Sequence, residues 1–132
     1  MLSLVLPWPP STNHYLRHVG TKILISAAGR QFRRAVAECC LLQLVGIPRP
    51  LETRLALVVF LYPPTHQLTD IDNRIKPLQD ALQQAMVYVN DAQIDEIHLY
   101  RREIIAGGKA EVRIVEYAYE FVPLTLLIGE TP

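Results

Sequence analysis

The chain of 132 residues has little of several features that mark particular classes of protein. It carries 13 Lys and Arg against 13 Asp and Glu, so it lacks the net positive charge that is usual for a DNA-binding domain. Acidic metal ligands would offset basic groups in such a sum, so DNA binding is not excluded. No apolar run approaches the length that spans a bilayer, and we expect no membrane partner. The N-terminus lacks a basic region and prolines interrupt it, so we predict no signal peptide.

Cysteine is scarce as well, because Cys39 and Cys40 are the only two. They are adjacent in an apolar, helix-like stretch, where neighbouring side chains point in different directions, so no bridge between them is expected. We interpret both as buried, reduced thiols of a cytoplasmic protein. The histidines and cysteines do not have zinc-site spacing, and the sequence has neither a glycine-rich phosphate loop nor a nucleophilic serine elbow. Those site classes are therefore not indicated.

The composition that is present is that of a globular domain. Hydrophobic residues make up 50% of the chain and charged residues 20%, which is enough apolar material for one buried core. The order of elements predicts an α/β (α+β) fold, with a mixed sheet of about five strands and two main helices. Apolar patterning predicts strands at 2–6, 22–25, 54–62, 93–101 and 111–117, and helices at 27–45 and 75–89.

The connections between these elements carry their own expectations. We expect 11–20 to be a loop with polar and aromatic tips. The unit 54–101 has the pattern of a right-handed strand–helix–strand crossover. The turn at 106–109, with two glycines, predicts a closing hairpin between the last two strands.

Two positions mark the ends of the second helix. Pro77 removes a helical hydrogen bond, so either the first turn at 72–76 is separate or distorted, or the regular helix begins near Pro77. The sequence does not decide between these alternatives. Asn90 is predicted to be the left-handed residue that ends this helix.

The candidate chemistry lies in residues 68–91. Asp70 and Asp72 are two positions apart after a predicted strand, so in an extended segment both carboxylates point the same way. Carboxylate oxygens suit a hard cation such as Mg²⁺, and Lys76 places a positive charge nearby. Asp91 stands past the helix, so its convergence with the others requires the chain to fold back. This pattern predicts metal-dependent hydrolysis of a phosphodiester.

Structural explanations of the same residues stay open. Asp72 would also serve as a helix N-cap or pair with Lys76 four residues later. Asp70 would then be an ordinary loop residue, and Asp91 part of a simple turn. Trp8 and Tyr15 are interpreted first as anchors of the core or of a loop.

Several stretches together resemble the RusA family of Holliday junction resolvases. They follow the family's order and spacing over roughly residues 2–117, and they leave 118–132 outside. We therefore predict a RusA-like nuclease domain at 1–117 and a tail at 118–132 that packs on the domain or on a dimer partner. The matching stretches are 6–15 (LPWPPSTNHY), 70–77 (DIDNRIKP), 80–82 (DAL) and 90–94 (NDAQI).

The resemblance implies a magnesium-dependent endodeoxyribonuclease that works as a homodimer and resolves four-way DNA junctions by paired nicks. Such enzymes act in recombination and repair in bacteria, often from prophages, which implies a cytoplasmic, nucleoid-associated protein. Mn²⁺ would substitute for Mg²⁺. The family's acidic catalytic residues and metal ligands fall on Asp70, Asp72 and Asp91, and its essential lysine on Lys76.

DNA contacts would then fall to basic residues. For Trp8 and Tyr15, wedging or stacking at the junction centre is the alternative to their structural role. Two other functions stay open: a dimer that binds branched DNA without cutting it, and a magnesium-dependent phosphatase or nuclease for another branched structure. The candidate DNA-binding residues are Arg17, Lys22, Arg30, Arg33, Arg34, Arg74, Arg101 and Arg102.

Overall fold

A computed structural model of the protein describes residues 1–116, so the predictions for the tail at 118–132 lie outside the described residues. The described elements, in chain order, are β1 (Leu2–Leu6), α1 (Thr12–Tyr15), β2 (Leu16–Val19), β3 (Lys22–Ile25), α2 (Ala27–Gln43), β4 (Leu55–Tyr62), the 3₁₀ turn η1 (Asp72–Arg74), α3 (Ile75–Gln84), the 3₁₀ turn η2 (Asp91–Gln93), β5 (Ile94–Arg101) and β6 (Lys109–Glu116).

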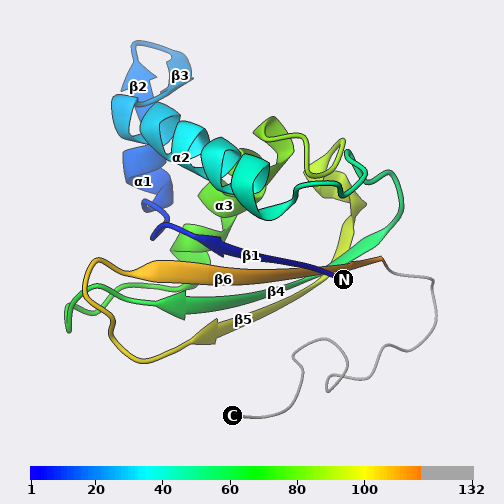
Figure 1. The fold of residues 1–132 in the computed structure, drawn as a ribbon. Helices are drawn as coiled ribbons and strands as arrows, with labels where there is room; N and C mark the ends of the chain where they lie inside the picture. Colours follow the sequence, from blue (N-terminus) through cyan, green and yellow to red (C-terminus); the bar gives the residue numbers. More distant parts are fainter. Residues whose placement is uncertain (117–132) are drawn as a thin grey trace.

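Four strands form the main sheet in the order β1-β6-β4-β5, and helices α2 and α3 pack on one face of it (Figure 1). Strand β4 is parallel to β5 and antiparallel to β6. All eight residues of β4 are buried, which explains why this strand is a continuous apolar run rather than an alternating one. The predicted α+β class with a mixed sheet and two main helices is confirmed.

The predicted closing hairpin is wrong, because β6 does not pair with β5. Strand β6 instead lies between β1 and β4 and is antiparallel to both. The connection crosses the end of β4, where Arg102 N donates to Leu61 O at 2.7 Å and Ile105 N donates to Pro63 O at 2.9 Å. This crossing delivers β6 to the other side of β4.

The predicted loop at 11–20 is also wrong, since this segment contains α1 and β2. Ser11 caps α1 by accepting a hydrogen bond from His14 N, and Gly20, at φ +59°, turns the chain between β2 and β3. These two strands form a separate two-stranded sheet. The predicted strand at 22–25 therefore exists, but it lies in a hairpin that projects away from the main sheet (Figure 1).

The start of the second helix resolves the alternatives at Pro77 in favour of a separate first turn. Residues Asp72–Arg74 form η1, and α3 begins at Ile75. Pro77 is the third residue of α3, where its backbone nitrogen has no helical acceptor to lose.

The end of α3 differs from the prediction in both place and residue. The helix ends at Gln84, and Met86 is the left-handed residue, at φ +63°. Asn90 is extended, at φ −149°, and caps the following turn η2 instead. Reversal at Met86 turns the next two side chains, Val87 and Tyr88, into the core, where both are fully buried.

The other helix follows its prediction closely. Ser26 caps α2 by accepting a hydrogen bond from Gly29 N at 2.9 Å, and the helix ends at Gln43, two residues before the predicted end. Cys39 and Cys40 are both free thiols, but only Cys40 is fully buried and Cys39 is half-buried; burial raises the pKa of each. No helix within residues 1–116 is long and apolar enough to cross a membrane.

Candidate functional site

The two neighbouring carboxylates follow the buried strand β4. Asp70 ends the loop after that strand, and Asp72 is the first residue of η1. Both side chains are exposed, and neither has a hydrogen-bond or ion-pair partner within residues 1–116. Asp72 does not act as a cap, because η1 is preceded by Ile71 with no side-chain capping bond. The capping explanation of Asp72 is therefore wrong.

Lys76 pairs with Asp91 rather than with Asp72. Its Nζ lies 2.9 Å from Asp91 Oδ2. The chain folds back along α3 to make this pair: Tyr88 OH donates to Gln79 O at 2.6 Å, and Asp91 N donates to Gln83 Oε1 at 2.9 Å. The fold therefore brings Asp91 back beside Lys76 at the start of α3.

The three acids do not form one ligand set in the described part of the chain. Within residues 1–116, no three His, Cys, Asp or Glu side chains gather closely enough to hold a metal ion. Asp70 and Asp72 nevertheless each offer an exposed carboxylate with no partner within residues 1–116. The extended segment predicted between them is wrong, because Ile71 is helical, at φ −67° and ψ −35°, and Asn73 N donates to Asp70 O at 3.3 Å. The rule that side chains two apart on a strand point the same way therefore does not apply to this pair. Mg²⁺ commonly takes one or two carboxylates and completes its shell with water and phosphate oxygens, so this donor pair fits it.

The N-terminal segment holds η1 in place. The guanidinium of Arg74 lies 5.1 Å from the centroid of the Trp8 ring, and its Nη1 donates to Pro9 O at 2.9 Å. Thr12 Oγ1 donates to Asn73 O at 3.0 Å. These contacts support the interpretation of Trp8 as an anchor. They also give the proline-rich segment a structural role that does not depend on DNA. Beside them lies a groove of about 360 Å³, lined by Trp8, His14, Pro63, Pro64, Thr65, Gln67, Leu68, Thr69 and Arg74.

Tyr15 is likewise an internal anchor. Its hydroxyl is bonded to Asp80 and accepts from Arg33 Nε at 2.7 Å, while Arg33 Nη2 pairs with Asp80 at 2.5 Å. Burial, with the neighbouring Asp80, raises the pKa of Tyr15 to about 12. This cluster ties α1 to α2 and α3, so Arg33 is engaged in holding the helices together.

The predicted basic residues do not form one cluster. Arg17 and Lys22 are exposed on the β2–β3 hairpin, and Arg34 is exposed on α2. Arg30 Nη1 donates to Ile25 O at 2.9 Å. The remaining two lie at the end of β5. Arg101, its last residue, donates from Nη2 to Thr69 O, and Arg102, the next residue, lies over the Phe60 ring and pairs with Glu103.

Comparison with known proteins identifies the family. Residues 7–115 match the family described as endodeoxyribonuclease RusA. The chain belongs to the RusA family. It is 32% identical over 120 residues to the crossover junction endodeoxyribonuclease RusA of Escherichia coli K12, covering 89% of this chain and 97% of that protein. The RusA protein of Enterobacteria phage 82 is 32% identical over 119 residues, covering 89% and 96%. The resemblance found in the sequence is thereby confirmed.

Sequence reasoning did not find several of the long-range bonds that hold α1, η1 and α3 of this RusA-family chain together. Thr69, Thr12 and Asp80 each bond to a residue more than four positions away in the chain, from 5 to 65 residues distant. A single Thr in a loop carries no pattern that would predict such a bond. The proximity of Trp8 to Arg74 is equally a product of the fold, since 66 positions separate them.

Proposed function

We propose that this protein is a metal-dependent endodeoxyribonuclease that resolves four-way DNA junctions by paired symmetric nicks in recombination and repair. The observation that carries the proposal is the pair Asp70 and Asp72, exposed and without a partner within residues 1–116, in a chain of the RusA family. Bacterial and phage relatives named crossover junction endodeoxyribonucleases support the substrate class. A cytoplasmic, nucleoid-associated site of action and a prophage origin agree with them.

Asp70 and Asp72 would hold Mg²⁺, with Mn²⁺ as a substitute and Asp91 as a third acidic group. When bound, the metal supplies Lewis acidity at the phosphate and a water of lowered pKa. Lys76 contributes a positive charge that stabilises negative charge developing on the phosphate oxygens. The Asp91 carboxylate, 2.9 Å from Lys76 Nζ, orients that ammonium group at the start of α3.

The projecting β2–β3 hairpin is proposed as the principal DNA contact outside the site. In its register Arg17 pairs with Leu24 and Val19 with Lys22, so Arg17 and Lys22 lie on the same face of the hairpin. Both are exposed, and a cationic face of this kind binds phosphates in a salt-dependent manner. Arg34 and Arg30 on α2, and Arg102 after β5, are proposed as further contacts, whereas the internal bonds of Arg33 leave less of its charge for DNA.

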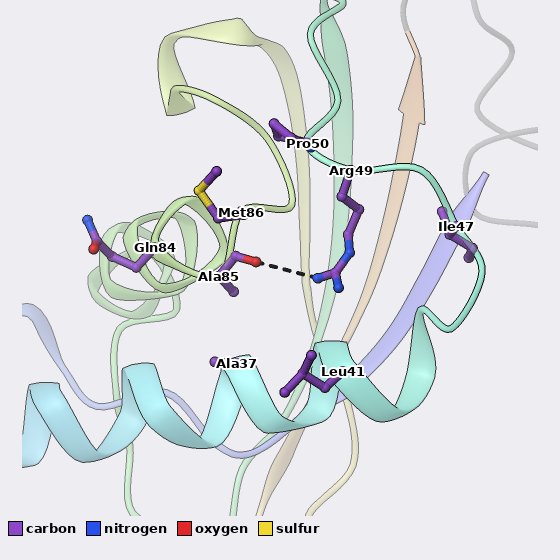
Figure 2. Close-up of a pocket in the computed structure, with 8 residues that line it drawn as sticks. All are labelled: Ala37, Leu41, Ile47, Arg49, Pro50, Gln84, Ala85 and Met86. Atoms are coloured by element: carbon purple, nitrogen blue, oxygen red, sulfur yellow. Dashed lines mark hydrogen bonds between the residues drawn. The ribbon is translucent and has the colours of Figure 1, made fainter.

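A homodimer is proposed because a two-fold symmetric pair of sites matches a two-fold symmetric junction. The surface that the partner subunit would cover lies at the end of α2 and just after the end of α3. Large apolar side chains are exposed there, with Leu41 at 67% and Met86 at 58%, and such patches mark interfaces. Figure 2 shows Leu41, Arg49 and Met86 around the groove between these elements, with Arg49 Nη1 3.4 Å from Ala85 O.

Leu41→Lys is expected to weaken self-association by at least about 100-fold, because it buries a charge in an apolar contact. The exposure of Leu41 in the single chain means that folding should be preserved. Sedimentation equilibrium measures the association constant, and Ile104→Lys, at an exposed apolar residue outside this surface, is the matched control. An unchanged association constant for Leu41→Lys would exclude this surface from the interface.

The direct test of the proposed function uses a synthetic four-way junction with labelled strands. With Mg²⁺ the protein is expected to release two nicked duplexes cut at symmetric positions, and without divalent metal to bind the junction without cutting. Denaturing gels locate the nicks, and gel-shift titration measures binding on the same samples. Binding with no cutting at any metal concentration would favour the alternative of a non-cleaving dimer that holds branched DNA.

A further inference from the structure

Thr69, the residue before Asp70, is bonded by two arginines from different parts of the chain. Arg74 donates to its side-chain oxygen, with Nη2 at 2.9 Å and Nε at 3.3 Å from Thr69 Oγ1. Arg101, the last residue of β5, donates from Nη2 to the Thr69 backbone oxygen at 2.7 Å. The side-chain hydroxyl oxygen and the backbone carbonyl oxygen of Thr69 therefore each accept hydrogen bonds from an arginine.

Arg74 is itself fixed in place. One face of its guanidinium lies against the Trp8 ring, and its Nη1 donates to Pro9 O. Burial lowers the pKa of Arg74 from its ordinary value, but a guanidinium stays charged at neutral pH. The Arg74 guanidinium thus contacts Trp8, Pro9 and Thr69 at the same time. The side chain acts as a brace that links the N-terminal segment to the loop before Asp70.

The loop needs such a brace because little else holds it. Residues 65–68 are exposed, and Leu68 is 92% exposed, so apolar burial does not fix the end of the loop. The carboxylates of Asp70 and Asp72 have no partner within residues 1–116 that would orient them. The position of these two carboxylates therefore depends on the backbone on either side of them, which is Thr69 before and η1 after.

We propose that Arg74 and Arg101 are positioning residues that clamp Thr69 and thereby hold Asp70 and Asp72 in the geometry that cutting requires. This inference rests on the proposed nuclease function. It gives these two arginines a different role from the DNA contacts that their charge predicts. Misplacement of a reacting group by about 1 Å costs on the order of 100-fold in rate. Loss of the clamp is therefore expected to lower the rate of the cutting step.

The clamp is specific to arginine in the case of Arg74. Its planar fork reaches Thr69 Oγ1 through two nitrogens while a third reaches Pro9 O, and its central carbon lies over the Trp8 ring. A lysine ammonium is a single compact charge and cannot make these contacts together. Arg74→Lys is therefore expected to behave like Arg74→Gln, although it keeps the charge.

The test removes the Thr69 hydroxyl while keeping its shape. Thr69→Val is expected to slow single-turnover cutting of a preformed protein–junction complex by about 10- to 100-fold and to raise the Mg²⁺ concentration for half-maximal rate. The junction dissociation constant without metal should stay within about twofold. Thr69→Ser restores the hydroxyl and should recover most of the rate. Thr53→Val, an exposed threonine whose side chain makes no bond within residues 1–116, is the matched control.

Salt dependence separates positioning from DNA contact at the arginines. Loss of one phosphate contact lowers the slope of log affinity against log salt by about one. Arg17→Gln, at the proposed hairpin contact, should show that change, whereas Arg74→Gln and Arg101→Gln should keep the slope and lose cutting rate. A changed slope in Arg74→Gln, or a Thr69→Val protein that cuts at the normal rate, would overturn the clamp. Failure of the unaltered protein to cut any junction would instead overturn the proposed function.

Discussion

Asp70→Asn is expected to abolish junction cutting while leaving junction binding intact. The Asp70 carboxylate is exposed and has no partner within residues 1–116, so its loss removes a metal ligand without breaking an internal bond. We expect the cutting rate to fall by on the order of 10³-fold or more, since the metal would lose one of its two proposed carboxylate ligands. Binding should be equal or tighter, because one negative charge near the phosphates is removed.

The measurement pairs a single-turnover cutting assay with a metal-free gel shift on the same junction. Glu52→Gln is the matched control, since Glu52 is also exposed and has no partner within residues 1–116. Thermal unfolding should give the same midpoint for the unaltered protein and Asp70→Asn. If Asp70→Asn cuts at the normal rate, Asp70 is not part of the site. If Glu52→Gln loses as much cutting rate as Asp70→Asn, the loss is a general effect of charge.

Lys76→Ala is expected to slow cutting by about 100- to 1,000-fold with metal binding preserved. A preorganised positive group that stabilises developing charge is typically worth that much in rate. The lysine is exposed and is bonded to Asp91 alone among residues 1–116, so its removal should cost little stability. The Mg²⁺ concentration for half-maximal rate should change little, because no metal ligand is lost.

A second surface ion pair provides the control for this variant. Lys109 Nζ lies 2.8 Å from Glu111 Oε1, close to the 2.9 Å of the Lys76–Asp91 pair, but at the start of β6. Lys109→Ala should therefore leave the cutting rate unchanged. If Lys76→Ala instead raised the metal requirement strongly at an unchanged maximal rate, Lys76 would act by holding Asp91 for the metal and not on the phosphate.

Much of the local structure was predictable because it depends on neighbouring residues. The start of α3, the Ser26 cap of α2 and the apolar run of β4 all appear where the sequence predicts them. Asp70, Asp72 and Lys76 stand out in the sequence for the same reason, since they are neighbours along the chain, two and four positions apart. The metal site at Asp70 and Asp72 stays a proposal, supported by family membership and by the absence of partners for these two carboxylates within residues 1–116.

The strand order of the sheet and the end of α3 could not be predicted from local sequence. A turn with two glycines suggests a hairpin, yet β6 pairs with β4 and β1 because bonds from 102 and 105 carry the connection across the end of β4. The end of α3 was misplaced for a related reason. Met86 adopts a left-handed conformation that its residue type disfavours, and burial of Val87 and Tyr88 compensates for it.

The sequence by itself therefore determined the class of fold, the main helices and the acidic motif with its lysine. Only the tertiary structure decided what surrounds that motif: the pairing of Lys76 with Asp91, the brace of Arg74 against Trp8, and the two bonds to Thr69. The physical reason is distance along the chain. Periodicity and capping act over a few residues, whereas partners 15, 32 or 66 positions apart meet only when the sheet and helices have packed.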